Sequence, residues 1–106
     1  MIIAIPASKD KIDALTDERF GRCPFFCLYN TRTGNHIFKK NIIKDASDGV
    51  GLRAAEFLAN NGVDEVYAME VGPKAQGVLK RLKIKINPVD SGQTVAKIIN
   101  MLNHKN

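Results

Sequence analysis

Two cysteines and two arginines lie close together in a polar segment near the amino terminus. Cys23 and Cys27 form a CxxxC pair, and Arg19 and Arg22 precede it. A thiolate is a soft metal ligand, and a neighbouring guanidinium such as that of Arg22 would stabilise it. On one extended strand the two Cα atoms would lie roughly 13 Å apart, too far for a disulfide or for one shared ion. Cys23 could therefore act as a single soft metal ligand or simply pack in the core, and Cys27 is predicted as a buried apolar side chain.

A small polar loop at residues 45–51 precedes a helical pattern and contains two glycines. Gly49 and Gly51 would let backbone amides approach a ligand closely, and the helix that follows adds a partial positive charge. Gly72, which Pro73 follows, predicts a second helix start of this kind. These features predict an anion-binding site with the nearby arginines as its cationic rim. The alternative is that the glycines serve only turns and caps.

The hydropathy pattern predicts the elements that must position these residues. Strands are predicted at 2–6, 25–31, 36–43, within 63–71 and at 84–89, and helices at 52–60, 73–82 and 91–103. Residues 8–22 are predicted as a long loop with one helical turn at 10–15. Two crossovers would place helices on both faces of a mixed five-stranded sheet, which is a three-layer α/β/α fold. Such folds bind ligands beyond the carboxyl ends of their parallel strands.

The chain has 106 residues, of which 44% are hydrophobic and 25% charged. This composition fits one globular domain spanning residues 1–106. No apolar run approaches the roughly 18 residues that a membrane helix needs. The apolar run at the amino terminus is short and contains Pro6, which predicts a strand rather than a signal peptide. We therefore expect a cytoplasmic protein with no membrane partner.

The net charge of +5 is unevenly distributed along the chain. Residues 1–44 sum to +4, residues 45–72 to −5 and residues 73–106 to +6, counting Lys and Arg against Asp and Glu. A dedicated duplex-binding domain would carry a continuous basic stripe instead. The pattern therefore argues against nucleic acid as the partner and favours a compact anion near the basic loop.

Four sequence blocks together resemble a known family. They are FGRCPFF at 20–26, GVG at 49–51, NGVD at 61–64 and GPKA at 72–75. In this order they resemble the dinitrogenase iron-molybdenum cofactor biosynthesis domain family, which includes small stand-alone prokaryotic members. The resemblance implies a ribonuclease H-like three-layer fold. It also implies that the domain binds or carries an anionic metal-sulfur cluster of molybdenum, iron or copper, or its precursor, without catalysis. Cluster donor or acceptor proteins would be its partners.

The sequence departs from the family at one position. Many cofactor-binding members carry His just before the Phe-Gly pair, where this chain has Arg19. A guanidinium stays protonated and cannot act as an ordinary metal ligand, but it can hold a negative cluster electrostatically. The residues predicted to contact the cluster are Arg19, Gly21, Arg22, Ser47, Gly49, Gly51 and Gly72, with Cys23 as the metal ligand.

Three other classes of function have less support in the sequence. The chain could bind a phosphate-bearing ligand, either nucleotide or nucleic acid, because GVGLRA at 49–54 fits the GxGxxA pattern of dinucleotide-binding proteins. Glu70 follows at the sequence spacing expected of the acidic residue that binds the ribose. The amphipathic strand and polar stretch before the GxGxxA pattern oppose a dinucleotide fold. The domain could instead serve protein interactions without any ligand. We expect no enzymatic activity, since a nuclease of this fold needs a carboxylate on the first strand, and His36 and His104 lie apart from the other candidates.

Overall fold

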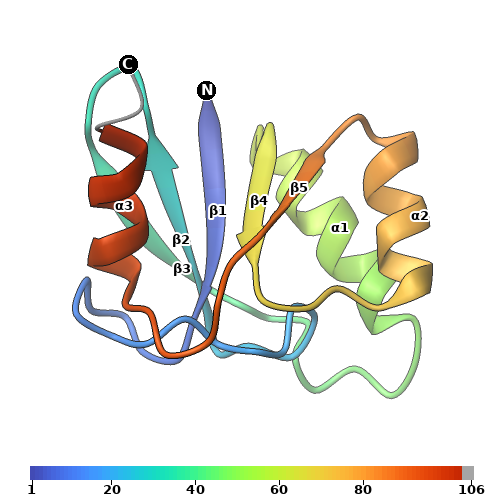
Figure 1. Cartoon of the computed structure of the whole chain (residues 1–106). Helices are drawn as coiled ribbons and strands as arrows, with labels where there is room; N and C mark the ends of the chain where they lie inside the picture. The colour runs from blue at the N-terminus through green and yellow to red at the C-terminus, as the bar shows by residue number, and fades with distance from the viewer. Residues whose placement is uncertain (104–106) are drawn as a thin grey trace.

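The computed structural model describes residues 1–103, and in it a five-stranded sheet separates two layers of helices (Figure 1). The strands are β1 (Ile2–Ala7), β2 (Phe25–Asn30), β3 (His36–Lys40), β4 (Glu65–Ala68) and β5 (Lys85–Pro88). The helices are α1 (Val50–Asn60), α2 (Pro73–Arg81) and α3 (Val95–Asn103). His104 lies outside the described residues.

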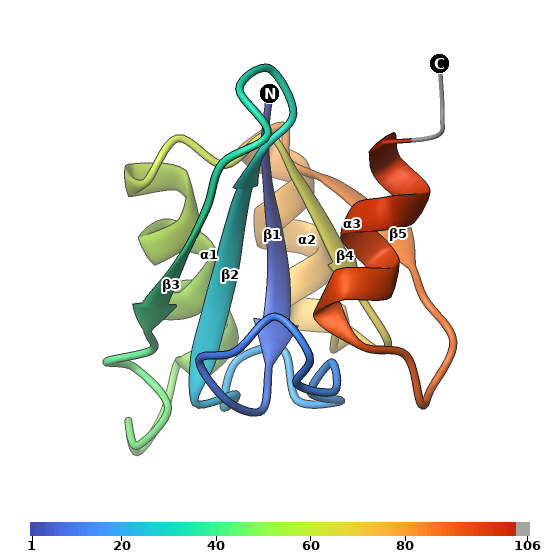
Figure 2. The same cartoon turned by 90° about the vertical axis from the view of Figure 1, so that its left-hand side faces the viewer.

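The strand order across the sheet is β3-β2-β1-β4-β5. The β1–β2 and β2–β3 pairs are antiparallel, whereas β1–β4 and β4–β5 are parallel. Helices α1 and α2 cover one face and α3 covers the other, as the two views show together (Figures 1 and 2). The predicted three-layer α/β/α fold with a mixed five-stranded sheet is therefore confirmed.

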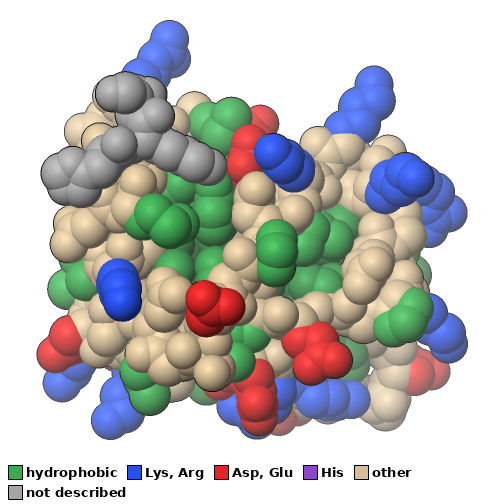
Figure 3. Space-filling model, viewed as in Figure 1, with side chains coloured by type: hydrophobic (Ala, Val, Ile, Leu, Met, Phe, Trp, Pro, Cys, Tyr) green, Lys and Arg blue, Asp and Glu red, His purple; other side chains and the backbone are tan. Residues whose placement is uncertain are grey.

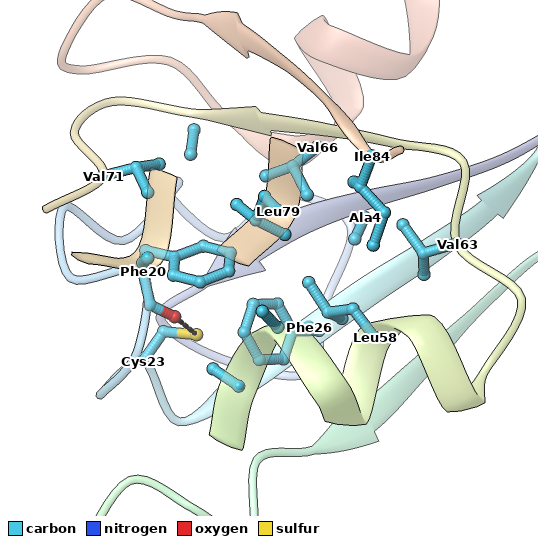
Figure 4. Packing of buried hydrophobic residues seen from close by; sticks show 14 of the residues in the cluster. Ala4, Phe20, Cys23, Phe26, Leu58, Val63, Val66, Val71, Leu79 and Ile84 are labelled. Atoms are coloured by element: carbon cyan, nitrogen blue, oxygen red, sulfur yellow. Dashed lines mark hydrogen bonds between the residues drawn. The ribbon is translucent and has the colours of Figure 1, made fainter. Parts of the chain in front are cut away.

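Two separate hydrophobic clusters fill the layers. The cluster beneath α1 and α2 contains Phe26, Leu58 and Leu79 (Figure 4), and the cluster beneath α3 contains Ile5 and Ile98. The central strand β1 is apolar on both faces because it supplies both clusters with alternate side chains. Within residues 1–103, no helix is long and apolar enough to cross a membrane.

The predicted elements differ most from the structure at three places. Residues 10–15 form no helix; they make a single turn that the Ala14 N–H closes onto the Lys11 carbonyl at 3.0 Å. Strand β3 ends at Lys40, because Asn41 turns inward and bonds to an earlier loop. Helix α3 begins at Val95 rather than at residue 91, since residues 90–94 form the connection from β5.

Candidate functional site

The carboxyl ends of the parallel strands meet at one edge of the sheet, which we call the carboxyl edge. The segments that follow β1, β4 and β5 all lie there, at the bottom of Figure 1, together with the first turns of α1 and α2. The amino terminus and the end of α3 lie at the opposite edge. This arrangement agrees with the expected place of a ligand site in an open α/β sheet.

The first turns of α1 and α2 lie side by side because glycines let them approach. A Cβ atom on Gly51 would lie 3.0 Å from the Ala75 Cβ, so the two helices touch at this point. A Cβ atom on Gly21 would lie 2.5 Å from Val50 Cγ1, which presses the loop at residue 21 against the start of α1. Gly21 and Gly51, which were predicted as ligand contacts, thus have a packing role in this structure.

The backbone N–H groups at the starts of α1 and α2 are open. Within the described chain, neither helix has a side-chain cap. The N–H groups of Val50, Gly51 and Leu52 in α1, and of Lys74 and Ala75 in α2, have no acceptor among residues 1–103. Each helix therefore presents unsatisfied donors and the positive end of its dipole at the carboxyl edge.

The start of α3 is closed, in contrast. The carbonyls of Ile12 and Ala14 accept hydrogen bonds from its first two N–H groups at 2.8 and 2.9 Å. The hydroxyl of Thr94 accepts a third from the Lys97 N–H at 3.1 Å, so Thr94 caps this helix. The long loop after β1 therefore blocks α3, and the open helix starts are those of α1 and α2.

Two hollows lie along the carboxyl edge and share one side chain, Met69. One hollow, of about 510 Å³, lies beside the start of α2 and is lined by residues that include Gly72 and Pro88. The other, of about 390 Å³, lies beside the loop after β1 and is lined by residues that include Thr16 and Gly92. We call the two hollows together the Met69 groove.

The side chains of the groove are more acidic than the sequence suggested. Its lining includes the carboxylates of Asp17, Glu18 and Glu70 but only one basic side chain, that of Arg19. On the face shown in Figure 3, acidic side chains lie over the lower half, with Lys and Arg side chains along the bottom edge beneath them. The expected concentration of basic side chains is therefore not found in the groove, and the positive charge comes instead from the open helix starts.

The side chain of Arg19 forms an ion pair with Asp17. Its Nε and one terminal nitrogen each donate to the Asp17 carboxylate at 3.0 Å, and its backbone N–H donates at 2.8 Å. Burial acts to raise the pKa of Asp17, but the hydrogen bonds and charge of Arg19 outweigh it and lower that pKa below its usual value. Contact between Arg19 and a ligand stays a prediction, and any such contact would come from a guanidinium already paired with a carboxylate.

Arg22 and Ser47 belong to the connection before α1. A terminal nitrogen of Arg22 donates to the Lys44 carbonyl at 2.9 Å, so this side chain braces the segment that leads to Gly49. Gly49 itself has a φ of 63°, which favours glycine, and it precedes the first turn of α1. Ser47 is exposed in the same connection. The contacts with a ligand that were predicted for Arg22, Ser47 and Gly49 stay predictions.

Asn41 is a positioning residue that the sequence did not reveal. It is 1% exposed, and its side-chain amide donates to the carbonyls of Gly21 and Cys23 at 3.0 and 2.9 Å. It thereby holds the loop at residues 20–24 against the end of β3. In the sequence Asn41 is only a polar residue at the end of an amphipathic strand. Such residues are common, so the sequence did not indicate that Asn41 binds another loop.

Cys23 lies in the core rather than at an electropositive surface. Its side chain is fully buried, and its Sγ lies 3.4 Å from the Phe20 carbonyl, to which the thiol donates (Figure 4). Burial, reinforced by the charge of Asp17, raises the pKa of the thiol to about 12. A metal ligand must be a thiolate, so this environment does not favour the predicted ligand role.

Cys27 is equally buried, in the cluster beneath α3, and its prediction as a core residue is confirmed.

We expect that neither thiol of the native protein reacts with Ellman's reagent in mildly alkaline buffer, whereas both thiols of the denatured chain react. Burial raises the pKa of each from 9.0 to about 12. As pH rises, the thiols of the unfolded chain lose their protons before those of the folded chain. The contribution of the two thiols to the free energy of unfolding is therefore complete below pH 9.0 and is lost as pH rises toward 12. A fast-reacting native thiol would contradict the buried placement.

The chain is a small α/β domain that presents two open helix starts at the carboxyl edge of its sheet, and helix starts of this kind are suited to binding anions. The chain belongs to the dinitrogenase iron-molybdenum cofactor family, whose model matches residues 1–105. The family resemblance drawn from the four sequence blocks is thereby confirmed.

Three relatives illustrate the similarity. An uncharacterised protein of Methanocaldococcus jannaschii is 32% identical over 89 residues, which cover 81% of this chain and 72% of that protein. The apo form of the orange protein from Desulfovibrio gigas has a TM-score of 0.88 at 32% identity and covers 93% of this chain and 83% of its own. A NifB-like protein of Thermotoga has a TM-score of 0.82 at 30% identity, with coverages of 98% and 88%.

Proposed function

We propose that this protein binds and carries an anionic metal-sulfur cluster, or its precursor, at the carboxyl edge and does not itself catalyse a reaction. The cluster would contain molybdenum, iron or copper. The observation that carries the proposal is the pair of open, adjacent helix starts at α1 and α2. Membership of the iron-molybdenum cofactor family supports the same class of ligand.

Open helix starts suit a ligand that must be both held and released. Each exposed helix end stabilises a nearby anion by about 0.3–1 kcal/mol, and the N–H groups can donate to sulfide without any covalent bond. The thiols of Cys23 and Cys27 are buried, and residues 1–103 contain no group of three His, Cys, Asp or Glu that could hold a metal ion. The proposed cargo brings its own sulfide ligands, and donor and acceptor proteins would exchange it as an intact anion.

A phosphate-bearing ligand is the second candidate. Open helix starts bind phosphate by the same donors, which favours this reading. The carboxylates of Asp17, Glu18 and Glu70 repel any anion beside the site, so they do not separate the two candidates. The lining of the Met69 groove counts against phosphate because its one basic side chain, that of Arg19, is already paired with Asp17, whereas proteins hold phosphate with Arg or Lys.

The two candidates separate in one anaerobic titration. The purified protein is mixed with tetrathiomolybdate and copper(I), passed through a desalting column, and measured for visible absorbance, molybdenum and copper. We expect a chromophore that stays with the protein at a fixed metal-to-protein ratio. A colourless, metal-free protein that instead binds ATP tightly would contradict the proposal and support the phosphate ligand.

A further inference from the structure

Strand β3 forms one side of the sheet, and its outer side is unpaired (Figure 2). The carbonyl of Asn35, just before β3, and the N–H of Asn41, just after it, both bond toward β2 at 2.9 Å. Since backbone direction alternates along a strand, the odd-numbered residues of β3 face β2 and the even-numbered residues face outward. The outward backbone groups of His36, Phe38 and Lys40 have no partner among residues 1–103.

The other side of the sheet does not offer such a row of donors. Strand β5 bonds toward β4 through the N–H of Lys85, so Ile86 and Pro88 face outward. Proline has no N–H, which leaves Ile86 as the one outward residue of β5 with a donor. A proline on an edge strand protects it against pairing with another chain. Strand β3 contains no proline, so its edge remains a template for an added strand.

The surface around β3 is strongly basic. Residues 24–44, which contain β2, β3 and their connection, carry four Lys or Arg side chains and no Asp or Glu. Lys39 and Lys40 lie on opposite faces of β3, and neither forms an ion pair within residues 1–103. Two copies of β3 would bring these lysines together, which disfavours pairing of the protein with itself. The same charges attract a strand that carries carboxylates.

Apolar surface lies on both faces of β3 beside the free edge. Ile37 is 54% exposed, and with Leu28 and Asn61 it lines a hollow of about 450 Å³ on the face that α1 covers. Phe38 is half-buried on the opposite face, where it packs against the cluster beneath α3. An added strand would direct alternate side chains to these two faces. Apolar side chains would enter the hollow beside Ile37, and carboxylates would lie beside Lys40.

We propose that β3 is the docking site for an extended, acidic segment of a partner protein, which adds to the sheet as a sixth strand. Main-chain hydrogen bonds to His36, Phe38 and Lys40 supply the affinity. The basic surface and the hollow select a segment in which Glu or Asp alternates with apolar residues. This surface uses none of the groups assigned to anion binding, so the inference does not depend on the proposed function.

The probe is a synthetic peptide of about seven residues that alternates glutamate and valine, titrated into the ¹⁵N-labelled protein at low salt. We expect it to slow the hydrogen exchange of the N–H groups of His36, Phe38 and Lys40, while those of Ile37 and Lys39 change less. A peptide that alternates lysine and valine should bind at least about 10-fold more weakly. Equal binding of the two peptides, or a response without this alternation along β3, would overturn the inference.

Two pairs of variants test the main-chain and the charge contributions separately. His36→Pro removes one outward N–H at the first residue of an edge strand, where proline is tolerated. It should weaken binding of the glutamate peptide about 5-fold more than His36→Ala, which keeps that N–H. Lys39→Glu should weaken binding about 5-fold, whereas Lys80→Glu makes the same charge change in α2, near β5, and should change it less than about 2-fold. Equal losses within either pair would contradict the docking site.

Sedimentation of the protein alone gives a further check. We expect a monomer, because the lysines of β3 repel a second copy. A dimer in which the N–H groups of His36, Phe38 and Lys40 already exchange slowly would show that a second copy covers this edge, and it would overturn the inference. Lys39→Glu should leave the binding of tetrathiomolybdate and copper(I) unchanged, so a failure of the docking site and a failure of the proposed function are distinguishable.

Discussion

Replacing Gly72 by Asp should weaken tetrathiomolybdate binding by about 100-fold while the protein stays folded, because like charges in close contact repel by several kcal/mol. Gly72 has a φ of −61° and a ψ of 157°, which any residue adopts, and a Cβ atom there would meet nothing within 4 Å. An Asp at this position is a preferred helix cap, and its carboxylate would accept from the open N–H groups of α2. The variant therefore fills the anion site with a negative charge of its own.

Two matched variants separate charge from other effects of Gly72→Asp. Gly72→Asn also caps α2 but carries no charge, and it should weaken binding by less than the Asp variant. Gly77→Asp adds the same charge in the middle of α2, where a Cβ atom would also meet nothing within 4 Å, and it should change binding little. Equal losses for Gly72→Asp and Gly77→Asp in calorimetry would mean that net charge, rather than the helix start, controls binding.

Replacing Gly51 by Leu should destabilise the protein by about 3 kcal/mol, because overpacking a close contact forces the backbone to shift. The loss would lower the midpoint of thermal unfolding by more than about 10 °C in a domain of this size. A Cβ atom alone would lie 3.0 Å from the Ala75 Cβ, and the rest of the leucine side chain would push α1 away from α2. Leucine is a better helix former than glycine, so a loss of stability must come from packing.

The control for Gly51→Leu is Gly77→Leu. Gly77 lies inside α2, and a Cβ atom there would meet nothing within 4 Å. The same substitution should therefore stabilise the protein by up to about 1 kcal/mol through helix propensity alone. If differential scanning calorimetry showed Gly51→Leu to be as stable as Gly77→Leu, the two helix starts would not be in the contact described.

Local patterns were sufficient to predict most of the fold. The apolar run at residues 2–6 and the amphipathic stripes of the helices each follow from hydropathy within a few residues. Gly72-Pro73 marked the start of α2 because proline favours the first helical position. Helix α1 has no such proline, and its start was predicted at residue 52, two residues after the observed start at Val50.

The remaining features depend on contacts between residues far apart in the chain. The loop near Ala14 caps α3, some 80 residues later, and no local pattern in either segment indicates it. Asn41 binds the loop that contains Cys23 and so helps to hold this thiol in the core, where a ligand role is not favoured. Arg19 was expected to be free for a ligand, but Asp17, two residues earlier, takes two of its donors. Charge counts along the sequence could not distinguish a free cation from a paired one.

The central claim is that an anionic metal-sulfur ligand sits at the open starts of α1 and α2. A titration of ¹⁵N-labelled protein with tetrathiomolybdate and copper(I), followed by amide NMR, tests it most directly because both metals are diamagnetic in these states. We predict that the largest shifts occur at the amides of Val50, Gly51, Leu52, Lys74 and Ala75, and that the capped amides of Val95 and Ala96 move little. Shifts that centre on α3 or on β3 instead, or that scatter over the surface, would contradict the claim.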